Sequence, residues 1–365
     1  MKLQPGSVEE LQQIVQSHRC LLPCGGGTKP ALSTPAGEAV QLEMSRLAGI
    51  IEYEPGEYTF TAYAGTPVRQ VVAVLAENGQ YLPFDPLLVE EGATLGGTVA
   101  ANTSGSGRYR YGGVRDFILG VHFIDGHGQL VRSGGKVVKN SAGFDLPKFM
   151  VGSLGRFGVL VDMSFKVFPE PRAYMSLQVT YASLDSALQA IYHLSTAPFD
   201  LDILDLVPVD HQADFMLVIR LGGLAEALPG RVERLHDFLK RQTGMKVAER
   251  IEGEAETNLW QVVNSCRWVA EGMSLVKAPL APKSIPILEQ KIAGGLPRRY
   301  TAGGNIAWLA SPDVAALDVS LTELGLAGLS LFGPPGRPYL GLRKGLPLAQ
   351  RVKQALDPAG KFLDL

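Results

Sequence analysis

Three successive glycines at positions 25–27, within the run Pro23 to Pro30, restrict the fold of this chain more than any other feature. Glycine adopts positive φ without strain and lets the main chain approach a ligand that a Cβ would hold away. Backbone N–H groups in such a run can turn inward around an anion, and a diphosphate fits that concavity. A plain turn is the alternative for a glycine run taken alone. The run therefore predicts an anion-binding loop after an apolar strand.

Two further segments are rich in small residues. The first runs from Glu91 to Gly105 and resumes from Arg110 to Asp116, and the second covers Lys139 to Leu146 and then Gly152 to Leu160. A flat ring system such as an isoalloxazine requires walls without bulky side chains, and amide donors for its polar edges. The first segment offers both. Together with the glycine run, these segments favour a nucleotide site for a cofactor with such a ring system.

Taken in order, the three segments resemble the FAD-binding domain of the vanillyl-alcohol oxidase and p-cresol methylhydroxylase superfamily (PCMH-type). Within it, they are most similar to the E-type, FAD-binding subunits of glycolate oxidase complexes. The likeness covers roughly residues 20–172 closely and then only the general layout and the run Leu356 to Phe362. The family often continues past that phenylalanine with Asn-Pro-Gly-Arg, whereas this chain reads Leu363-Asp364-Leu365.

The fold class expected is α+β. The run Pro169-Glu170-Pro171 disfavours both a helix and a central strand, so it marks a boundary. From Met175 to Ile251 the patterns read strand, helix, strand, strand, helix, strand, which is the order of a ferredoxin-like unit, and residues 272–333 repeat something similar. With the resemblance, this predicts a PCMH-type FAD-binding domain at residues 1–171, a ferredoxin-like α+β cap at 172–335 and a C-terminal return to the FAD domain at 336–365.

The resemblance implies that FAD is the cofactor. The family often attaches its flavin covalently through a histidine in or near the first loop, but no histidine lies between Arg19 and Val121. We therefore expect non-covalent FAD, with Cys20 and Cys24 as the remaining alternative for a thioether. The expected FAD-binding residues are Pro23, Gly25, Gly26, Gly27, Thr28, Pro86, Thr94, Gly96, Gly97, Ala101, Asn102, Ser104, Gly105, Tyr111, Gly112, Asp116, Gly155, Gly158 and Val159.

Composition excludes several classes of protein. With 34 basic and 36 acidic residues, the net charge of −2 predicts no nucleic-acid surface. The apolar stretches are too short to span a bilayer, and the N-terminus lacks the apolar core of a secretory signal. We therefore expect a cytoplasmic protein that meets the inner membrane only through partners. Three cysteines cannot supply the four thiolates of an iron–sulfur cluster, so any such cluster belongs to another polypeptide.

Residues for substrate oxidation are not evident in the sequence. The related D-type subunits look as if they use a histidine-rich metal site in the cap, but the six histidines here show no paired ligand spacing, so no metal is expected. Guanidinium groups suit a substrate carboxylate, although a solvated surface position is the alternative for each. No catalytic residue is assigned. The candidate arginines are Arg298, Arg299, Arg337 and Arg343.

Three functions remain open. The first is the FAD-binding subunit of a glycolate oxidase complex, transferring electrons as glycolate, a 2-hydroxy acid, is oxidised to glyoxylate, with a D-type flavin subunit and an iron–sulfur subunit as partners. The second is a self-sufficient FAD-dependent dehydrogenase of a small 2-hydroxy acid. The third is a non-catalytic, flavoprotein-like partner subunit.

Overall fold

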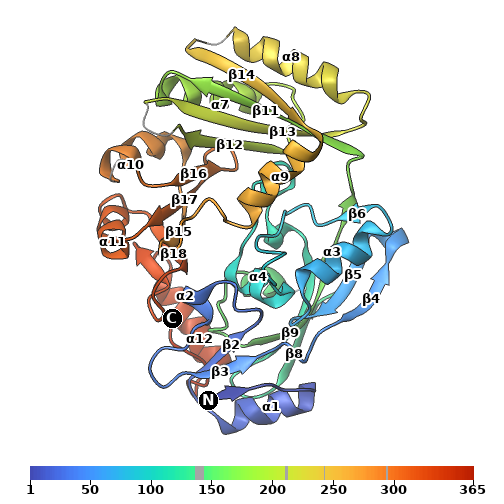
Figure 1. Ribbon diagram of the computed structural model, residues 1–365. Coiled ribbons are helices and arrows are strands. Elements are labelled where there is room, and N and C mark those ends of the chain that lie inside the picture. The colour runs from blue at the N-terminus through green and yellow to red at the C-terminus, as the bar shows by residue number, and fades with distance from the viewer. Residues whose placement is uncertain (136–143, 210–212, 242, 293–294) are drawn as a thin grey trace.

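The computed structural model describes residues 1–135, 144–209, 213–241, 243–292 and 295–365. Residues 1–169 form an N-terminal body, which lies below a broad antiparallel sheet built from the residues that follow (Figure 1). Part of the glycine-containing run at 139–146 and His211, which the sequence analysis included among the six histidines, lie outside the described residues.

The first part of the N-terminal body is a small parallel sheet. Its strands are β1 (Lys2–Leu3), β3 (Val40–Glu43) and β2 (Leu21–Cys24), in that order. Helix α1 (Val8–Ser17) begins where the Ser7 hydroxyl accepts a 3.1 Å hydrogen bond from the Glu10 N–H. Strand β2 leads directly into the glycine run at 25–27, and the short helix α2 (Pro30–Ser33) follows that run.

A five-stranded antiparallel sheet forms the second part of the body. Its order is β4 (Ile50–Glu54), β5 (Thr59–Tyr63), β9 (Val159–Lys166), β7 (Ile118–Ile124) and β8 (Leu130–Gly134). Helices α3 (Val68–Ala76) and α4 (Leu95–Ala101) bury their apolar residues in the cluster that covers this sheet. The remaining elements are α5 (Arg108–Tyr111), α6 (Leu146–Met150), and the paired strands β6 (Gln80–Tyr81) and β10 (Phe168–Pro169).

The upper sheet has nine antiparallel strands. Its order is β14 (Met245–Glu252), β11 (Ala173–Tyr181), β13 (Phe215–Gly223), β12 (Ile203–Pro208), β16 (Arg298–Thr301), β17 (Ile306–Ser311), β15 (Ser274–Pro279), β18 (Ala327–Phe332) and β19 (Tyr339–Gly341). With α7 (Leu184–Thr196) and α8 (Leu228–Lys240), strands β11–β14 make one ferredoxin-like unit. With α10 (Ile285–Lys291) and α11 (Val314–Glu323), β15–β18 make a second. The two units join where β12 pairs with β16.

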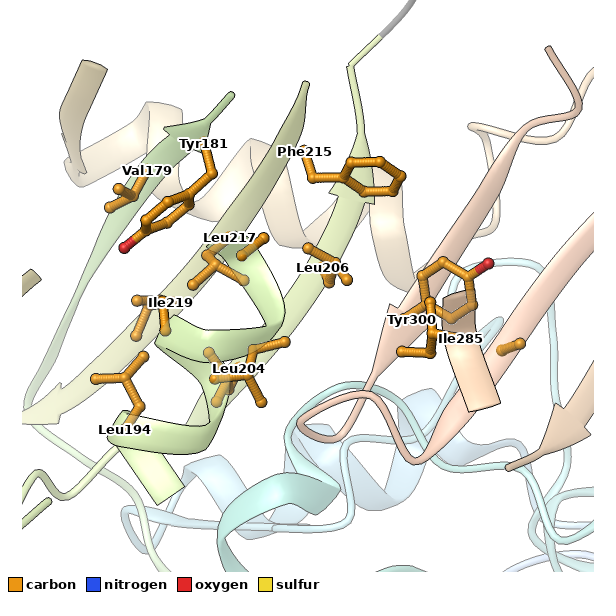
Figure 2. Close-up of a cluster of buried hydrophobic side chains, with 14 of the residues drawn as sticks. Val179, Tyr181, Leu194, Leu204, Leu206, Phe215, Leu217, Ile219, Ile285 and Tyr300 are labelled. Carbon is orange, nitrogen blue, oxygen red and sulfur yellow. The ribbon is translucent and has the colours of Figure 1, made fainter. Parts of the chain in front are cut away.

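The two faces of the upper sheet differ in character. One face packs Leu204, Leu217 and Tyr300 against the helices in an apolar core, which Figure 2 shows around α7 and α10. Since successive residues of a strand point to opposite faces, the other face carries their neighbours, and it meets the N-terminal body and helix α9 (Gly253–Asn264). Four buried polar residues of this body-facing side are Ser176, Asp205, Lys277 and Arg299.

The C-terminal segment returns to the N-terminal body after β19, which still pairs with β18 in the upper sheet. Helix α12 (Leu346–Leu356) packs on the body, and beyond it Phe362 forms a parallel bridge with Leu21 of β2. The Lys353 ammonium donates to the carbonyl of Arg156 at 2.8 Å and to that of Phe362 at 3.1 Å. The last residues are therefore tied to the strand that precedes the glycine run.

Candidate functional site

A cavity of about 730 Å³, counted out to its open mouth, lies beside the glycine run. Three separate segments supply most of its lining: residues 23–33, helix α4 with the residue before it, and residues 154–160. Of the residues expected to bind FAD, those on this cavity are Pro23, Gly25, Gly26, Gly27, Thr28, Thr94, Gly96, Gly97, Ala101, Gly155, Gly158 and Val159. Segments more than a hundred residues apart in the sequence thus meet at one site.

The three glycines of the loop serve different physical purposes. A Cβ at Gly25 would meet the Thr94 side chain, and a Cβ at Gly26 would meet the backbone carbonyl of Gly92. Gly27 has φ +69° and open space around it, so it is required by conformation and not by packing. Two glycines therefore dock the loop against the segment before α4, and this contact brings the loop amides and α4 to the same cavity.

Helix α4 lies close to the five-stranded sheet because its glycines lack side chains. Gly96 donates its N–H to the Ala64 carbonyl at 2.8 Å, and a Cβ on Gly96 would come within 2.8 Å of the Ala64 Cβ. The hydroxyl of Thr94 begins the helix by accepting from the Gly97 N–H at 3.3 Å. The lining residues on this side of the cavity, Ala64, Gly96 and Gly97, are consequently small.

The remaining residues expected to bind FAD lie off this cavity. Pro86 and Tyr111 line a second cavity between the N-terminal body and the upper sheet, and Gly105 lines a smaller third one. The other four take part in the local structure: the Asn102 carbonyl accepts from Lys277, Ser104 accepts from the Val114 N–H, Asp116 accepts from the Gly113 N–H, and a Cβ at Gly112 would meet Asp116.

A buried lysine in the first cavity was not among the expected site residues. Lys29 is 5% exposed, and its ammonium donates to the Thr28 hydroxyl at 3.3 Å. Burial lowers the pKa of Lys29 to about 8, and the neighbouring Cys266 thiol opposes this shift. Its position directly after a glycine run is the only signal in the sequence. That signal is weak, because a lone lysine after a turn is ordinarily solvated.

Buried charge also lies on the body-facing side of the upper sheet. Lys277 of β15 donates to the Asn102 carbonyl at 2.5 Å, and burial, with Arg108 nearby, lowers its pKa to about 7. On β12 and β16, which pair with each other, Asp205 accepts from the Ser106 hydroxyl at 2.5 Å and from the Arg299 guanidinium at 3.3 Å. Burial raises the pKa of Asp205 to about 6 despite the cation beside it.

The second cavity is open to solvent and measures about 1750 Å³ when the space out to its mouth is counted. Tyr81, Tyr111 and Tyr174 line it, and the Arg220 guanidinium lies 3.7 Å from the centroid of the Tyr174 ring. Arg220 donates at 2.7 Å and 3.0 Å to the two oxygens of Glu256, so its charge is compensated. This cavity is aromatic and polar.

The four arginines considered for a substrate carboxylate have partners already. Arg298 contacts Glu289, Arg299 contacts Asp205, and Arg337 contacts Asp318. Arg343 stacks over the Tyr339 ring at 3.8 Å. Across the described ranges, no group of three or more His, Cys, Asp or Glu side chains could hold a metal ion. Within the same ranges, no helix has the length and apolar character needed to cross a bilayer.

Comparisons with known proteins agree with this geometry. The family described as "FAD binding domain" matches residues 1–134. Glycolate oxidase subunit GlcE of Escherichia coli (strain K12) is 40% identical over 192 residues, which are 52% of this chain and 54% of that protein. Glycolate oxidase subunit GlcD of Bacillus subtilis (strain 168) is 26% identical over 343 residues, 89% of this chain and 70% of that protein. The chain thus spans about half the length of GlcE.

The fold has solved counterparts. A structure of alkyldihydroxyacetonephosphate synthase superposes with a TM-score of 0.71 over 98% of this chain and 74% of its own, at 16% sequence identity. A second crystal form of the same synthase gives a TM-score of 0.70. At this identity the likeness concerns the fold alone. Together with the FAD binding domain match over residues 1–134, it confirms the predicted PCMH-type fold with mixed α and β structure.

Proposed function

Residues 1–134 match the FAD binding domain family, and from this premise we propose that the chain is the FAD-binding subunit of a glycolate oxidase complex. In this proposal the chain binds FAD without a covalent bond in the first cavity and transfers electrons while glycolate, or a similar 2-hydroxy acid, is oxidised. A D-type flavin subunit and an iron–sulfur subunit are the proposed partners, and the proposed compartment is the cytoplasm.

One observation carries the proposal: three distant segments of small residues converge on one cavity that also holds a buried lysine. The residues fit FAD. The loop at 25–28 offers main-chain N–H groups for a diphosphate, and Gly96, Gly97 and Ala101 offer a wall without bulky side chains. When bound, FAD would supply a two-electron acceptor; the protein contributes binding, orientation and electrostatics.

The proposal gives substrate oxidation mainly to a partner subunit. Recognition of a 2-hydroxy acid requires a cation free to meet its carboxylate. Arg298, Arg299 and Arg337 each contact a carboxylate of this chain, and Arg343 lies on a tyrosine ring. Removing any of the three from its carboxylate would leave that charge unpaired. This arrangement favours a chain that holds and passes electrons over one that binds the acid itself.

A second candidate is a self-sufficient dehydrogenase. It is favoured by Lys277, a buried lysine on the side of the upper sheet that faces the N-terminal body. The hydrogen-bond acceptor of its ammonium is the Asn102 carbonyl and not a carboxylate. A 2-hydroxy acid bound near Lys277 would meet a cation that has no protein carboxylate hydrogen-bonded to it. This candidate needs no partner to reduce the flavin.

Anaerobic mixing of the purified chain with glycolate or D-lactate separates these functions. We expect the purified chain to be yellow and its flavin to pass into the supernatant when the protein is precipitated with acid. We also expect that neither glycolate nor D-lactate bleaches the flavin absorbance of the isolated chain. Bleaching in the isolated chain would support the dehydrogenase instead. Colourless protein that stays colourless with added FAD would favour the non-catalytic subunit. Affinity purification from the native host should add broad iron–sulfur absorbance, and its absence would overturn the proposed partners.

A further inference from the structure

Among the described residues, Lys29 is a buried cation with neither a carboxylate nor a carbonyl acceptor, whereas Lys277, which also lacks a carboxylate, donates to the Asn102 carbonyl. In the described part of the chain, the one hydrogen bond of the Lys29 ammonium goes to the Thr28 hydroxyl, at 3.3 Å. Lys353, by comparison, donates to Asp357 and three carbonyls, and Arg299 to Asp205. A buried ammonium without an anionic partner is costly, because desolvation is not repaid by attraction.

The groups that face Lys29 do not supply the missing charge. Cys266, from the turn after α9, is the titratable group coupled to the lysine. Burial and the nearby Glu91 raise the pKa of the Cys266 thiol to about 12, so this thiol is neutral at physiological pH. Lys29 and Arg299 both act on this thiol in the direction that lowers its pKa. The lysine is therefore buried beside a neutral thiol, which does not compensate its charge.

The lysine is held beside the loop that would receive a phosphate. Lys29 is one of the residues that line the first cavity, together with Gly25–Thr28, and the hydroxyl that its ammonium contacts belongs to the same loop. An ammonium group is a compact point charge that binds phosphate oxygens well. On these grounds we infer that Lys29 forms the ion pair with the diphosphate of the bound dinucleotide and so makes the site select flavin adenine dinucleotide over flavins without phosphate. This inference rests on the proposed function.

The consequence is a difference between two ligands that share the same ring system. FAD carries the diphosphate and riboflavin carries no phosphate. A charge-assisted hydrogen bond in a buried site is worth about 10- to 100-fold in affinity. Lys29→Met should therefore weaken FAD binding by about that factor and leave riboflavin binding within about 2-fold of the wild type. Lys240→Met, an exposed lysine on α8, is the matched control and should change neither.

The experiment titrates flavin-free protein with FAD and with riboflavin, following quenching of flavin fluorescence, for the wild type and the two variants. Circular dichroism checks that each variant is folded. Lys29→Met with unchanged FAD affinity would overturn the inference and leave the proposed function intact. An equal loss for FAD and riboflavin would also overturn it, since the lysine would then act on the shape of the site. Wild-type protein that binds neither flavin would overturn the proposed function and the inference together.

A pH series on the wild type keeps the test open if Lys29→Met does not fold. Binding of an anion requires the protonated amine, so the dissociation constant for FAD should rise above pH 8 by up to about 10-fold per pH unit. The constant for riboflavin should stay flat, and Cys266 does not titrate in this window. Parallel curves for the two flavins would contradict the inference.

Discussion

Replacing Gly96 with alanine should destabilise the chain although alanine is the better helix former. An ideal Cβ on Gly96 lies 2.8 Å from the Ala64 Cβ and 2.9 Å from the Ala64 carbonyl oxygen, closer than real Cβ atoms approach. One of these neighbours is backbone, so helix α4 must move. Overpacking of this kind costs about 1–3 kcal/mol, while the alanine gains at most about 1 kcal/mol in helix propensity. With the full gain subtracted, the net expectation is a loss of up to about 2 kcal/mol in unfolding free energy.

Gly230→Ala supplies the matched control, because Gly230 also lies in a helix and its added Cβ would meet only the Arg234 guanidinium, at 3.7 Å. Here only the helix propensity changes, so the unfolding free energy of the variant should rise by about 0.5–1 kcal/mol. Urea unfolding followed by circular dichroism measures both. The same glycine-to-alanine substitution should therefore lower the unfolding free energy at position 96 and raise it at position 230. A Gly96→Ala variant as stable as the wild type, with undiminished FAD affinity, would refute the claim that α4 lies at its closest approach to the sheet.

Two further predictions concern buried ionisable groups. Lys277→Met should remove a pH dependence of the unfolding free energy. The pKa of Lys277 is depressed to about 7 in the folded protein, so the unfolded chain binds more protons between pH 7 and 10.5. In urea titrations, the unfolding free energy of the wild type should therefore rise by about 5 kcal/mol relative to the variant across that window. Asp205→Asn acts in the opposite sense, because the pKa of Asp205 is raised to about 6 in the folded protein. The unfolding free energy of the wild type should fall by about 3 kcal/mol relative to the variant between pH 4 and 6. Equal slopes of unfolding free energy against pH for the two proteins would contradict the buried position of this carboxyl group.

The sequence was most informative where local chemistry decides the structure. The glycine run, the Ser7 cap and the order of strands and helices in the ferredoxin-like unit all follow from short-range patterns. The tract from Gly105 to Asp116 was less predictable, because composition cannot tell which cavity a loop faces. Tyr111 accordingly lies on the second cavity, and Asp116 closes a turn by accepting from a backbone N–H.

Buried charges were the features that the sequence could not predict. Lys29 and Lys277 follow no periodic pattern, since each is a single lysine among apolar or small residues. Their burial results from contacts between segments far apart in the chain, such as Lys277 with Asn102. The same holds for the arginines, whose carboxylate partners Asp205 and Asp318 come from other elements. Pair formation of this kind is a property of the tertiary structure.

The bridge between Leu21 and Phe362 has a consequence for the order of events during synthesis. Strand β2 leaves the ribosome early, whereas its neighbour at Phe362 follows more than three hundred residues later. At about 5–20 residues per second, the interval is roughly 20–70 s. Throughout that interval, the glycine run at 25–27 follows a strand that lacks its bridge to Phe362. Loading with a nucleotide is therefore expected to be a late, post-translational event.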